Sequence, residues 1–427
     1  MDNSKKSAKR LPAVTPQARL ARIVEDGVCI GCGLCQSLAG PDKVKVQRIE
    51  TGYECPVVVG ELDHETVDLI YDVCPGTRFN SLPQHLIDAD TQMDLYWGPY
   101  RQTLLAHASD DETRIKAATG GVLTALAKFL INSGRVDFVL HSRPSPQDAT
   151  FGEHQLSFDE SAVAAGTGSI YGPTAPLREI CRVLDRGQPF AFIGKPCDIA
   201  ALRNLALFDQ RVDRLVKYWL APICGGYIPP EAMDKFLATR GLQRTDLIKF
   251  RYRGDGCPGR VEFETKDGRT FDADMYEPYG GYDENSWQLP FRCKICPDGG
   301  GEAADICAGD QWENAAPDPV KSITDPGTNA VIVRTAAGEE LIEAAREAGH
   351  LTVVKPLDLR WYDTCQPHQL AKKRSLRARW DGLAAEGGLV PRTRGLRLET
   401  LAKETDPQTY QRQMEGARQR AKAVNKR

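Results

Sequence analysis

Three cysteines within seven residues constrain this chain more than any other feature of its sequence. Cys29, Cys32 and Cys35 are separated by two-residue gaps that each contain a glycine. Such gaps let a chain wrap one corner of a cube-shaped iron–sulfur cluster, and glycine lets the backbone approach the inorganic sulfides. Structural zinc sites normally use two separated Cys-x-x-Cys pairs instead. The spacing therefore favours a 4Fe–4S cluster over zinc or unligated thiols.

A 4Fe–4S cluster needs a fourth thiolate, and two Cys-Pro pairs further along the chain offer one. Cys74 is followed by Pro75, and Cys55 is followed by Pro56. A Cys-Pro pair commonly supplies the remote ligand of such a cluster. We predict Cys74 as the fourth ligand, with Cys55 as the alternative.

Four more cysteines form a second and more scattered candidate site. Cys197 and Cys224 each follow an apolar segment that we expect to be a strand. The carboxyl ends of parallel strands face one crevice, so two thiols that leave such ends can meet there. Cys293 and Cys296 add a Cys-x-x-Cys pair on a loop. We predict that these four hold a second 4Fe–4S cluster, with a zinc knuckle at the pair and two inert core thiols as the alternative.

The remaining cysteines are judged by their surroundings. Cys257 and Cys307 are rival ligands for the second cluster, whereas Cys181 and Cys365 are expected to be structural. The total of 13 cysteines is odd, and no apolar secretion segment follows the charged amino end, so a disulfide framework is not expected. We expect reduced thiols and a cytoplasmic location.

Charge and hydropathy exclude two classes of partner. The formal net charge is -3, which gives no global attraction to nucleic acid or anionic lipid. The basic carboxyl end lacks interleaved aromatic residues that would stack on bases. The most apolar helical stretch, residues 122–131, is too short to span a bilayer. We therefore expect neither nucleic-acid binding nor a membrane span.

The middle of the chain alternates apolar strands with helices, which indicates a mainly parallel sheet with crossover helices. We expect strands at 136–140, 190–193 and 218–223 and helices near 119–134, 174–186, 199–207 and 229–241. Beyond residue 245 the sequence pattern changes and predicts a β-hairpin that turns at Asp267-Gly268, followed by strands and a helix at an α/β edge. These later elements are expected at 249–253, 261–265, 270–273, 330–335, 339–348 and 351–355.

A helix start built of small residues is a candidate phosphate site. Thr119-Gly120-Gly121 would present free backbone N–H groups and the positive end of a helix dipole. The glycine-rich turn 166–172 adds hydroxyl groups. Small residues also begin helices for packing reasons, and no Gly-x-Gly-x-x-Gly follows a strand, so a Rossmann dinucleotide site is not indicated.

A set of motifs in fixed order, over roughly residues 28 to 400, resembles one known family. This is the coenzyme F-420 hydrogenase/dehydrogenase beta-subunit family, which also includes 7-hydroxymethyl chlorophyll a reductase and a ferredoxin-dependent divinyl chlorophyllide reductase. The order makes the set more specific than any one motif. The matching pieces are Cys29-x-x-Cys32-Gly33-x-Cys35, Trp97-Gly98-Pro99, Thr119-Gly120-Gly121-Val122-Leu123-Thr124-Ala125-Leu126, Gly194-Lys195-Pro196-Cys197, Arg251-Tyr252-Arg253-Gly254-x-Gly256-x-Pro258-Gly259, Arg292-Cys293-x-x-Cys296-Pro297-Asp298 and Ala304-Asp305-Ile306-x-x-Gly309-Asp310-x-Trp312.

The resemblance implies FAD and one or two 4Fe–4S clusters. It would place FAD against the helix start and the glycine-rich turn. Lys195, Tyr171 and Asp298 are candidate proton donors. The surroundings of the first cysteine group differ from those in the chlorophyll-reducing members, so a tetrapyrrole substrate is not expected. The expected cofactor-binding residues are Thr119, Gly120, Gly121, Thr124, Gly166, Thr167, Ser169, Tyr171 and Lys195.

These observations predict an iron–sulfur flavoprotein oxidoreductase. Electrons would pass between a one-electron donor, either ferredoxin or a partner subunit, and a small organic two-electron substrate or deazaflavin, through the clusters and FAD. One alternative is a coenzyme F-420 oxidoreductase beta subunit that acts as the electron-transfer module of a larger complex. A second alternative is a zinc-binding interaction protein.

The predicted fold is α/β, in five parts. A ferredoxin-like iron–sulfur region is followed by a mainly parallel-sheet FAD-binding domain and a mixed α+β C-terminal part. The expected divisions are a polar arm at 1–27, the 4Fe–4S cluster region at 28–90, the FAD-binding domain at 91–245, the second-cluster and mixed α/β domain at 246–365 and a basic C-terminal extension at 366–427.

Overall fold

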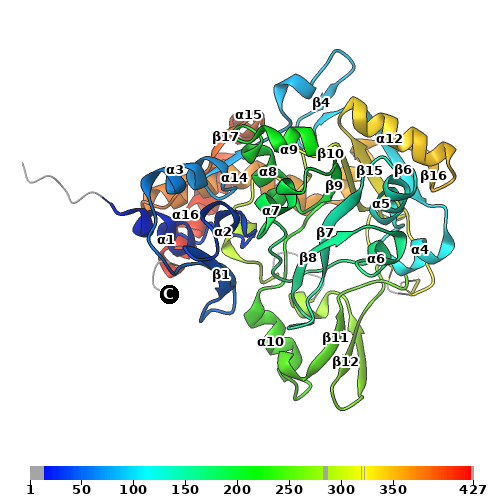
Figure 1. The fold of residues 1–427 in the computed structure, drawn as a ribbon, viewed down its shortest axis with the longest axis horizontal. Helices are drawn as coiled ribbons and strands as arrows, with labels where there is room; N and C mark the ends of the chain where they lie inside the picture. The colour runs from blue at the N-terminus through cyan, green and yellow to red at the C-terminus, as the bar shows by residue number, and fades with distance from the viewer. Residues whose placement is uncertain (1–13, 282–286, 319, 322, 425–427) are drawn as a thin grey trace, which may run out of the picture.

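An eight-stranded mixed sheet organises the larger part of the molecule (Figure 1). The computed structural model describes residues 14–281, 287–318, 320–321 and 323–424. From one edge to the other, the strands are β16 (Leu351–Pro356), β6 (Gln102–Ala108), β15 (Asn329–Val333), β14 (Ile306–Asp310), β10 (Val216–Pro222), β9 (Phe190–Ile193), β7 (Phe138–Pro144) and β8 (Gly152–Ser157).

The prediction of a mainly parallel sheet is wrong. Among the described strands of this sheet, only the pairings β7–β9, β9–β10 and β10–β14 are parallel. The pairings β14–β15, β15–β6, β6–β16 and β7–β8 are antiparallel. The strand–helix alternation in the sequence covers only the parallel part. Between β14 and β15 no described helix crosses the sheet, so the chain returns antiparallel.

Helices cover both faces of the sheet, because successive strand side chains point to opposite faces. In β9, Phe190 and Phe192 pack into one apolar layer and Ala191 into the other. One layer is closed by α7 (Ile180–Asp185), α8 (Pro196–Leu205) and α9 (Gln210–Leu215), and the other by α5 (Val122–Asn132), α6 (Glu160–Ala164) and α12 (Ala336–Glu347). A short helix, α4 (Asp111–Lys116), precedes α5.

One predicted helix is shorter than expected. The helix expected at 174–186 begins only at Ile180, where α7 starts. Pro176 explains the delay, because a proline disfavours helical geometry at the residue before it. The predicted hairpin at Asp267-Gly268 is confirmed and joins β12 to β13. It belongs to a small α/β unit made of α10 (Pro230–Ala238), β11 (Leu247–Arg251), β12 (Arg260–Thr265) and β13 (Thr270–Asp274).

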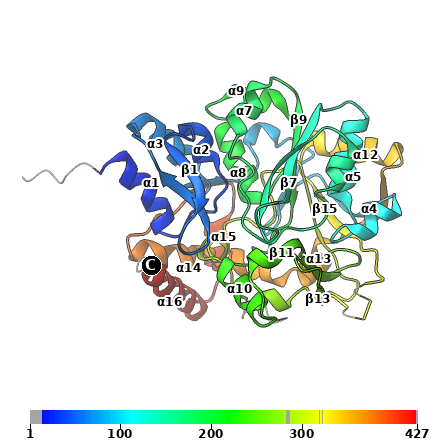
Figure 2. The same ribbon diagram turned by 60° about the horizontal axis from the view of Figure 1, so that its bottom comes forward.

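The two ends of the described chain meet beside the sheet (Figures 1 and 2). Leu20 and Ile23 of the first helix share an apolar core with Leu376 and Trp380 of a long C-terminal helix. The amino-end elements are α1 (Pro16–Glu25), α2 (Leu34–Ala39), β1 (Val44–Arg48), β2 (Glu54–Val58), α3 (His64–Val73) and β3 (Arg78–Asn80), followed by β4 (Gln92–Asp94) and β5 (Gly98–Tyr100). The carboxyl-end elements are α13 (Leu359–Cys365), α14 (Pro367–Ala385), β17 (Arg392–Arg394), α15 (Leu398–Lys403) and α16 (Pro407–Val424).

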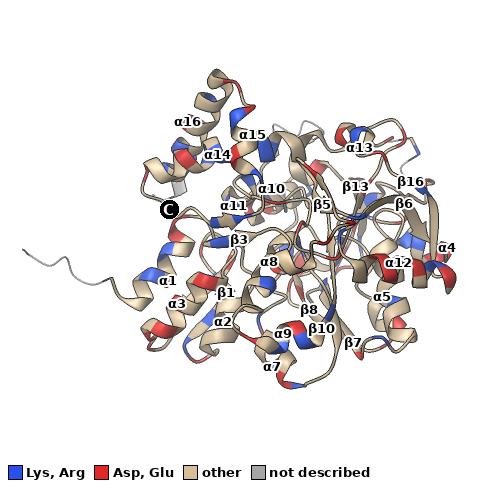
Figure 3. Cartoon of the chain, turned by 90° about the horizontal axis from the view of Figure 1, so that it is seen from above, with Lys and Arg blue, Asp and Glu red and all other residues tan. Residues whose placement is uncertain are grey.

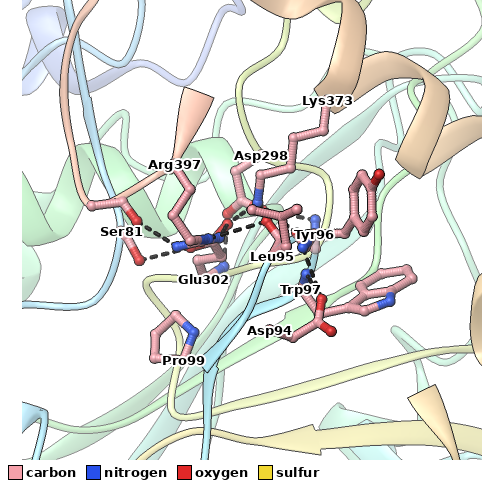
Figure 4. A network of polar contacts seen from close by, with 12 residues as sticks. Ser81, Asp94, Leu95, Tyr96, Trp97, Pro99, Asp298, Glu302, Lys373 and Arg397 are labelled. Atoms are coloured by element: carbon pink, nitrogen blue, oxygen red, sulfur yellow. Dashed lines mark hydrogen bonds and ion pairs between the residues drawn. The ribbon is translucent and has the colours of Figure 1, made fainter. Parts of the chain in front are cut away.

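A buried ion network fixes the C-terminal helices to the rest of the molecule (Figure 4). The Glu302 carboxylate is fully buried and accepts hydrogen bonds from Ser81 Oγ at 2.8 Å and Arg397 Nη2 at 2.6 Å. The Lys373 ammonium, on α14, also contacts it. Burial alone raises the pKa of Glu302, but Lys373 and Arg397 outweigh this effect and lower it to about 2. The network therefore joins three distant segments around one ionised carboxylate.

Elsewhere, Lys and Arg residues are interspersed with Asp and Glu residues over most elements (Figure 3). In the part of the chain that the structure describes, no helix combines the length and the apolar character needed to cross a membrane.

Candidate functional site

A crevice opens at the carboxyl ends of the four parallel strands. Its cavity of about 250 Å³ is lined by residues that leave β7, β9, β10 and β14, including Ser142, Lys195, Cys224 and Asp310. This is the edge where open α/β sheets bind ligands. Sites that enclose small molecules usually measure roughly 300–1,000 Å³. A nucleotide bound here would therefore keep part of its surface outside the cavity.

Most of the predicted cofactor residues line this crevice. Gly120 and Thr167 are the exceptions: they lie beside it without lining it. Gly120 has a positive φ of 64°, and its carbonyl accepts a hydrogen bond from Ala108 N at 2.7 Å. The lining residues from the predicted set are Thr119, Gly121, Thr124, Gly166, Ser169, Tyr171 and Lys195.

A lysine supplies positive charge to the crevice. Lys195 Nζ lies 2.8 Å from Asp198 Oδ2 and also contacts the Thr174 hydroxyl. Burial alone would lower the pKa of Lys195, but Asp198, together with Cys197 and Cys224, outweighs this effect and raises it. A lysine held this firmly in its charged form suits an anionic group better than it suits proton donation near neutral pH.

Two polar residues that the sequence did not assign to the site also line the crevice. Asp310 ends β14 and accepts hydrogen bonds from Thr119 Oγ1 and, at 2.7 Å, from Arg253 Nη1. Arg253 also donates to the Tyr171 hydroxyl at 3.1 Å, so it fixes both the helix start and the glycine-rich turn. His141 lies in the middle of β7 and also lines the crevice. The strand-end position of Asp310 is the signal that would have found it, whereas His141 has no such position.

The first cysteine group surrounds a small cavity of its own. Cys29, Cys32, Cys35 and Cys74 all line it, together with apolar residues of α1 and α3. Cys55 does not line this cavity, although its thiol lies close enough to the Cys29 thiol to raise the pKa of Cys29. The arrangement supports Cys74 rather than Cys55 as the fourth member of the group.

Tight backbone turns bring the thiols of the first group together. Gly33 has a φ of 89°, and a Cβ at that position would come within 2.7 Å of the Arg178 backbone. Gly31 N donates to Cys29 Sγ at 3.3 Å, and Gly76 N donates to Cys74 Sγ at 3.4 Å. Such N–H donors stabilise thiolates and tune the potential of a bound cluster.

The surroundings of these thiols fit an anionic iron–sulfur cluster. A four-iron cluster carries negative charge once its thiolates are bound. Arg292 is 3% exposed, and its Nε and Nη1 have no hydrogen-bond partner among the described residues. The Arg292 guanidinium lies near Cys29 and Cys74 and favours the thiolate forms of both. A negatively charged group bound by these thiolates would also be stabilised by this cation.

The second cysteine group converges from separate points of the chain. Cys197, Cys224, Cys293 and Cys296 lie close enough for their charges to interact, and burial raises the pKa of Cys293 to about 12. Cys224 lines the crevice, whereas Cys293 and Cys296 each line a different cavity. The second group therefore adjoins the crevice directly.

Tyr227 lies where these regions meet. It lines the crevice and is buried, with 8% of its surface exposed. Burial, followed by the nearby Cys293 and by Cys55 and Cys29, raises its pKa. The crevice, the second cysteine group and the first cysteine group are thus neighbours in space.

The other predicted residues lie outside these sites. The Asp298 carboxylate accepts from Gly300 N at 2.8 Å and Glu302 N at 2.7 Å, so it shapes the loop after Cys296 and does not line the crevice. Cys307 donates to the Gly301 carbonyl at 3.0 Å, inside the core. Cys257 contacts the Thr119 hydroxyl at 3.7 Å. Cys181 is half-buried on α7, and Cys365 is buried at the end of α13.

Comparisons with known proteins cover most of this architecture. One family, described as coenzyme F420 hydrogenase/dehydrogenase, beta subunit, matches the chain in two parts. The N-terminal part of that family matches residues 103–182. The C-terminal part matches residues 187–358. These ranges include the crevice and the second cysteine group.

Three curated relatives share the match. The chain is 24% identical over 346 residues to the coenzyme F420-dependent sulfite reductase of Methanocaldococcus jannaschii, which covers 76% of this chain and 47% of that protein. It is 26% identical over 258 residues to the F420-dependent formate dehydrogenase 1 subunit beta of Methanococcus maripaludis, covering 58% of this chain and 60% of that one. It is 22% identical over 272 residues to the coenzyme F420 hydrogenase subunit beta of Methanothermobacter thermautotrophicus, covering 61% and 86%. The chain thus spans about half to three fifths of the first two relatives.

A solved structure shares the fold. A chain of the F420-reducing NiFe hydrogenase complex from Methanosarcina barkeri superposes with a TM-score of 0.52 at 17% identity, covering 71% of this chain and 99% of that one. The predicted resemblance is confirmed: this chain belongs to the coenzyme F420 hydrogenase/dehydrogenase beta-subunit family.

Proposed function

We propose that this chain is the electron-transferring beta subunit of a coenzyme F420-dependent oxidoreductase. Two 4Fe–4S clusters would be held by Cys29, Cys32, Cys35 and Cys74 and by Cys197, Cys224, Cys293 and Cys296. FAD would lie in the crevice, and a partner subunit or a ferredoxin would exchange electrons with the chain. The named relatives are F420-dependent oxidoreductases or their beta subunits, which favours this subunit role over an enzyme with a separate organic substrate.

One observation carries the proposal: the two cysteine groups and the crevice form a continuous series. Cys224 belongs to the second group and also lines the crevice, and Tyr227 bridges toward the first group. A flavin exchanges electrons singly with clusters and in pairs with organic substrates. Lys195 would hold an anionic part of the flavin, and the network of Arg253, Asp310 and Thr119 would hold the helix start against it.

Cofactor analysis of anaerobically purified chain tests the proposal. We expect about eight irons, a matching amount of acid-labile sulfide and one FAD per chain. A content of about four irons per chain would show that only one of the two proposed clusters is present. A colourless preparation that contains zinc would support the zinc-binding alternative and refute the proposal.

Turnover separates the F420 role from a general electron-transfer role. The loaded chain is mixed with reduced F420 and a one-electron viologen dye, and dye reduction is followed anaerobically. We expect F420-dependent reduction of the dye. A chain with full iron and flavin that reduces the dye from dithionite but not from F420 would contradict the F420 assignment.

A further inference from the structure

Arg292 belongs to one cysteine group by sequence and to the other by contact. It directly precedes Cys293 in the short helix α11 (Phe291–Lys294). Its side chain turns away from that group, and Nη2 donates to the Pro75 carbonyl at 2.6 Å. Pro75 lines the cavity of the first cysteine group. The guanidinium therefore reaches the wall of the first site.

Arg292 has no carboxylate partner among the described residues, and it donates to the Pro75 carbonyl, whereas the equally unpaired Arg334 donates to three carbonyls. The side chain is 3% exposed, and neither Nε nor Nη1 has a hydrogen-bond partner among the described residues. Two other buried arginines have carboxylates: Arg253 pairs with Asp310 at 2.7 Å and Arg203 with Asp305 at 3.2 Å. No described carboxylate pairs with Arg292. A buried cation is costly unless a nearby negative group compensates it.

Pro75, to whose carbonyl Arg292 donates, directly follows Cys74 of the first group. The guanidinium lies close enough to the Cys29 and Cys74 thiols for their charges to interact. The thiols line one face of the site, and the unpartnered guanidinium approaches its wall at Pro75. This arrangement is complete only when an anionic group occupies the cavity.

We infer that Arg292 is the counter-charge of the first 4Fe–4S cluster and raises its reduction potential relative to that of a cluster without it. The inference rests on the proposed function, because it needs a cluster on the first cysteine group. One-electron reduction adds a negative charge to a cluster, so a buried cation stabilises the reduced form more than the oxidised form. Arg292 is a tuning residue in this role, and it is not a ligand.

The experiment compares three variants of the full chain, purified anaerobically. Arg292→Gln removes the charge, and Arg292→Lys keeps it. Arg178→Gln is the matched control: this arginine also lies beside the first group, against Gly33, but its charge is paired with Glu54 at 3.4 Å and is 30% exposed. Iron content is measured first, and each cluster is then titrated with dithionite under EPR detection. The first cluster is the one whose signal changes in Cys29→Ser.

We expect Arg292→Gln to keep its iron and to make one-electron reduction of the first cluster at least tenfold less favourable, which corresponds to a shift of about 59 mV to lower potential. Arg292→Lys should stay within threefold of the wild type, and Arg178→Gln should shift clearly less than Arg292→Gln. The potential of the second cluster should not move in any of them.

Two outcomes would overturn the inference. The first is an Arg292→Gln chain with full iron and an unchanged first potential. The second is equal loss of the first cluster from Arg292→Gln and Arg292→Lys in chains that remain folded by circular dichroism, because shape and not charge would then be required. Absence of iron from the first site of the wild type would instead refute the proposed function, so the two failures are distinguishable.

Discussion

The two cysteine groups are built in opposite ways. Three thiols of the first group come from one seven-residue stretch, and tight turns at glycines place them around a cavity. The thiols of the second group arrive from α8, from the end of β10 and from the loop around α11. The first site is therefore encoded locally, whereas the second exists only when the sheet has formed. A site whose cysteines are close in sequence, such as the first group, can be predicted from their spacing. A site assembled from separate elements, such as the second group, can be predicted only when the order of the strands is known.

The largest test of this comparison is the choice between Cys74 and Cys55. Cys74→Ser should lose about four irons per chain, because a four-iron cluster needs a thiolate on each iron. Cys55→Ser should keep them, because Cys55 lies outside the cavity. Iron analysis and EPR spectra of the two variants decide this. Loss of iron from Cys55→Ser alone would reverse the assignment.

The second test concerns the junction between the regions. Glu302→Gln should destabilise the chain by about 3–5 kcal/mol, because it removes the carboxylate that pairs with the buried Lys373 and the half-buried Arg397. Urea unfolding of the metal-free chain measures this loss. Glu399→Gln is the control, since its pair with Arg377 is exposed and should matter little. Equal unfolding midpoints for Glu302→Gln and the wild type would show that the network does not hold the regions together.

Between pH 7 and pH 5 a pH-dependent effect should appear in the crevice region. Burial lowers the pKa of His141 to about 4, below the value of about 6.5 expected in an unfolded chain. The unfolded state then binds the extra proton between pH 6.5 and pH 4, so stability is present above pH 6.5 and falls as the pH drops. We expect a loss of about 2 kcal/mol from this residue between pH 7 and pH 5.

Replacing the imidazole measures that contribution. His141→Gln should show a smaller drop in unfolding free energy between pH 7 and pH 5 than the wild type, by about the same 2 kcal/mol. His107→Gln, on a half-buried residue of β6, serves as the comparison. If the wild type and His141→Gln lose stability in parallel, the buried imidazole is not the source.

The smallest predicted effect belongs to the first region. Thr15 caps α1, and its hydroxyl accepts from Ala18 N at 3.2 Å. Thr15→Ala should cost about 1 kcal/mol, the usual effect of losing such a cap. Hydrogen exchange should then speed up in α1 but not in the strands of the sheet. Faster exchange throughout the sheet would mean that the two regions unfold as one unit.

The sequence predicted features that depend on neighbouring residues. The spacing of Cys29, Cys32 and Cys35 encodes the turns that gather their thiols, and Asp267-Gly268 encodes a hairpin. The helix start at Thr119 was found for the same reason. Glycine and proline restrict the backbone wherever they occur, so their effect can be read without the fold.

Features that depend on pairing between distant segments could not be read in this way. Cys55 and Cys74 have the same local pattern, and only the packing of α3 against the first loop separates them. The antiparallel half of the sheet was not predicted, because the direction of a strand depends on the connection that leads to it. Local periodicity in the sequence does not record these connections. Asp310 lies in one of the matching motifs, but its place in the crevice follows from the position of β14 between β10 and β15.

The parallel pairing of β17 with β3 has a consequence for biogenesis. Residues 392–394 complete a ribbon with residues 78–80, and α14 closes over α1. Translation produces the cysteines of the first group long before residues 392–394 and α14, so the core that both ends share can close only when synthesis is nearly complete. If the first group holds the proposed cluster, a chain shortened at its carboxyl end should retain less iron even with every cysteine present.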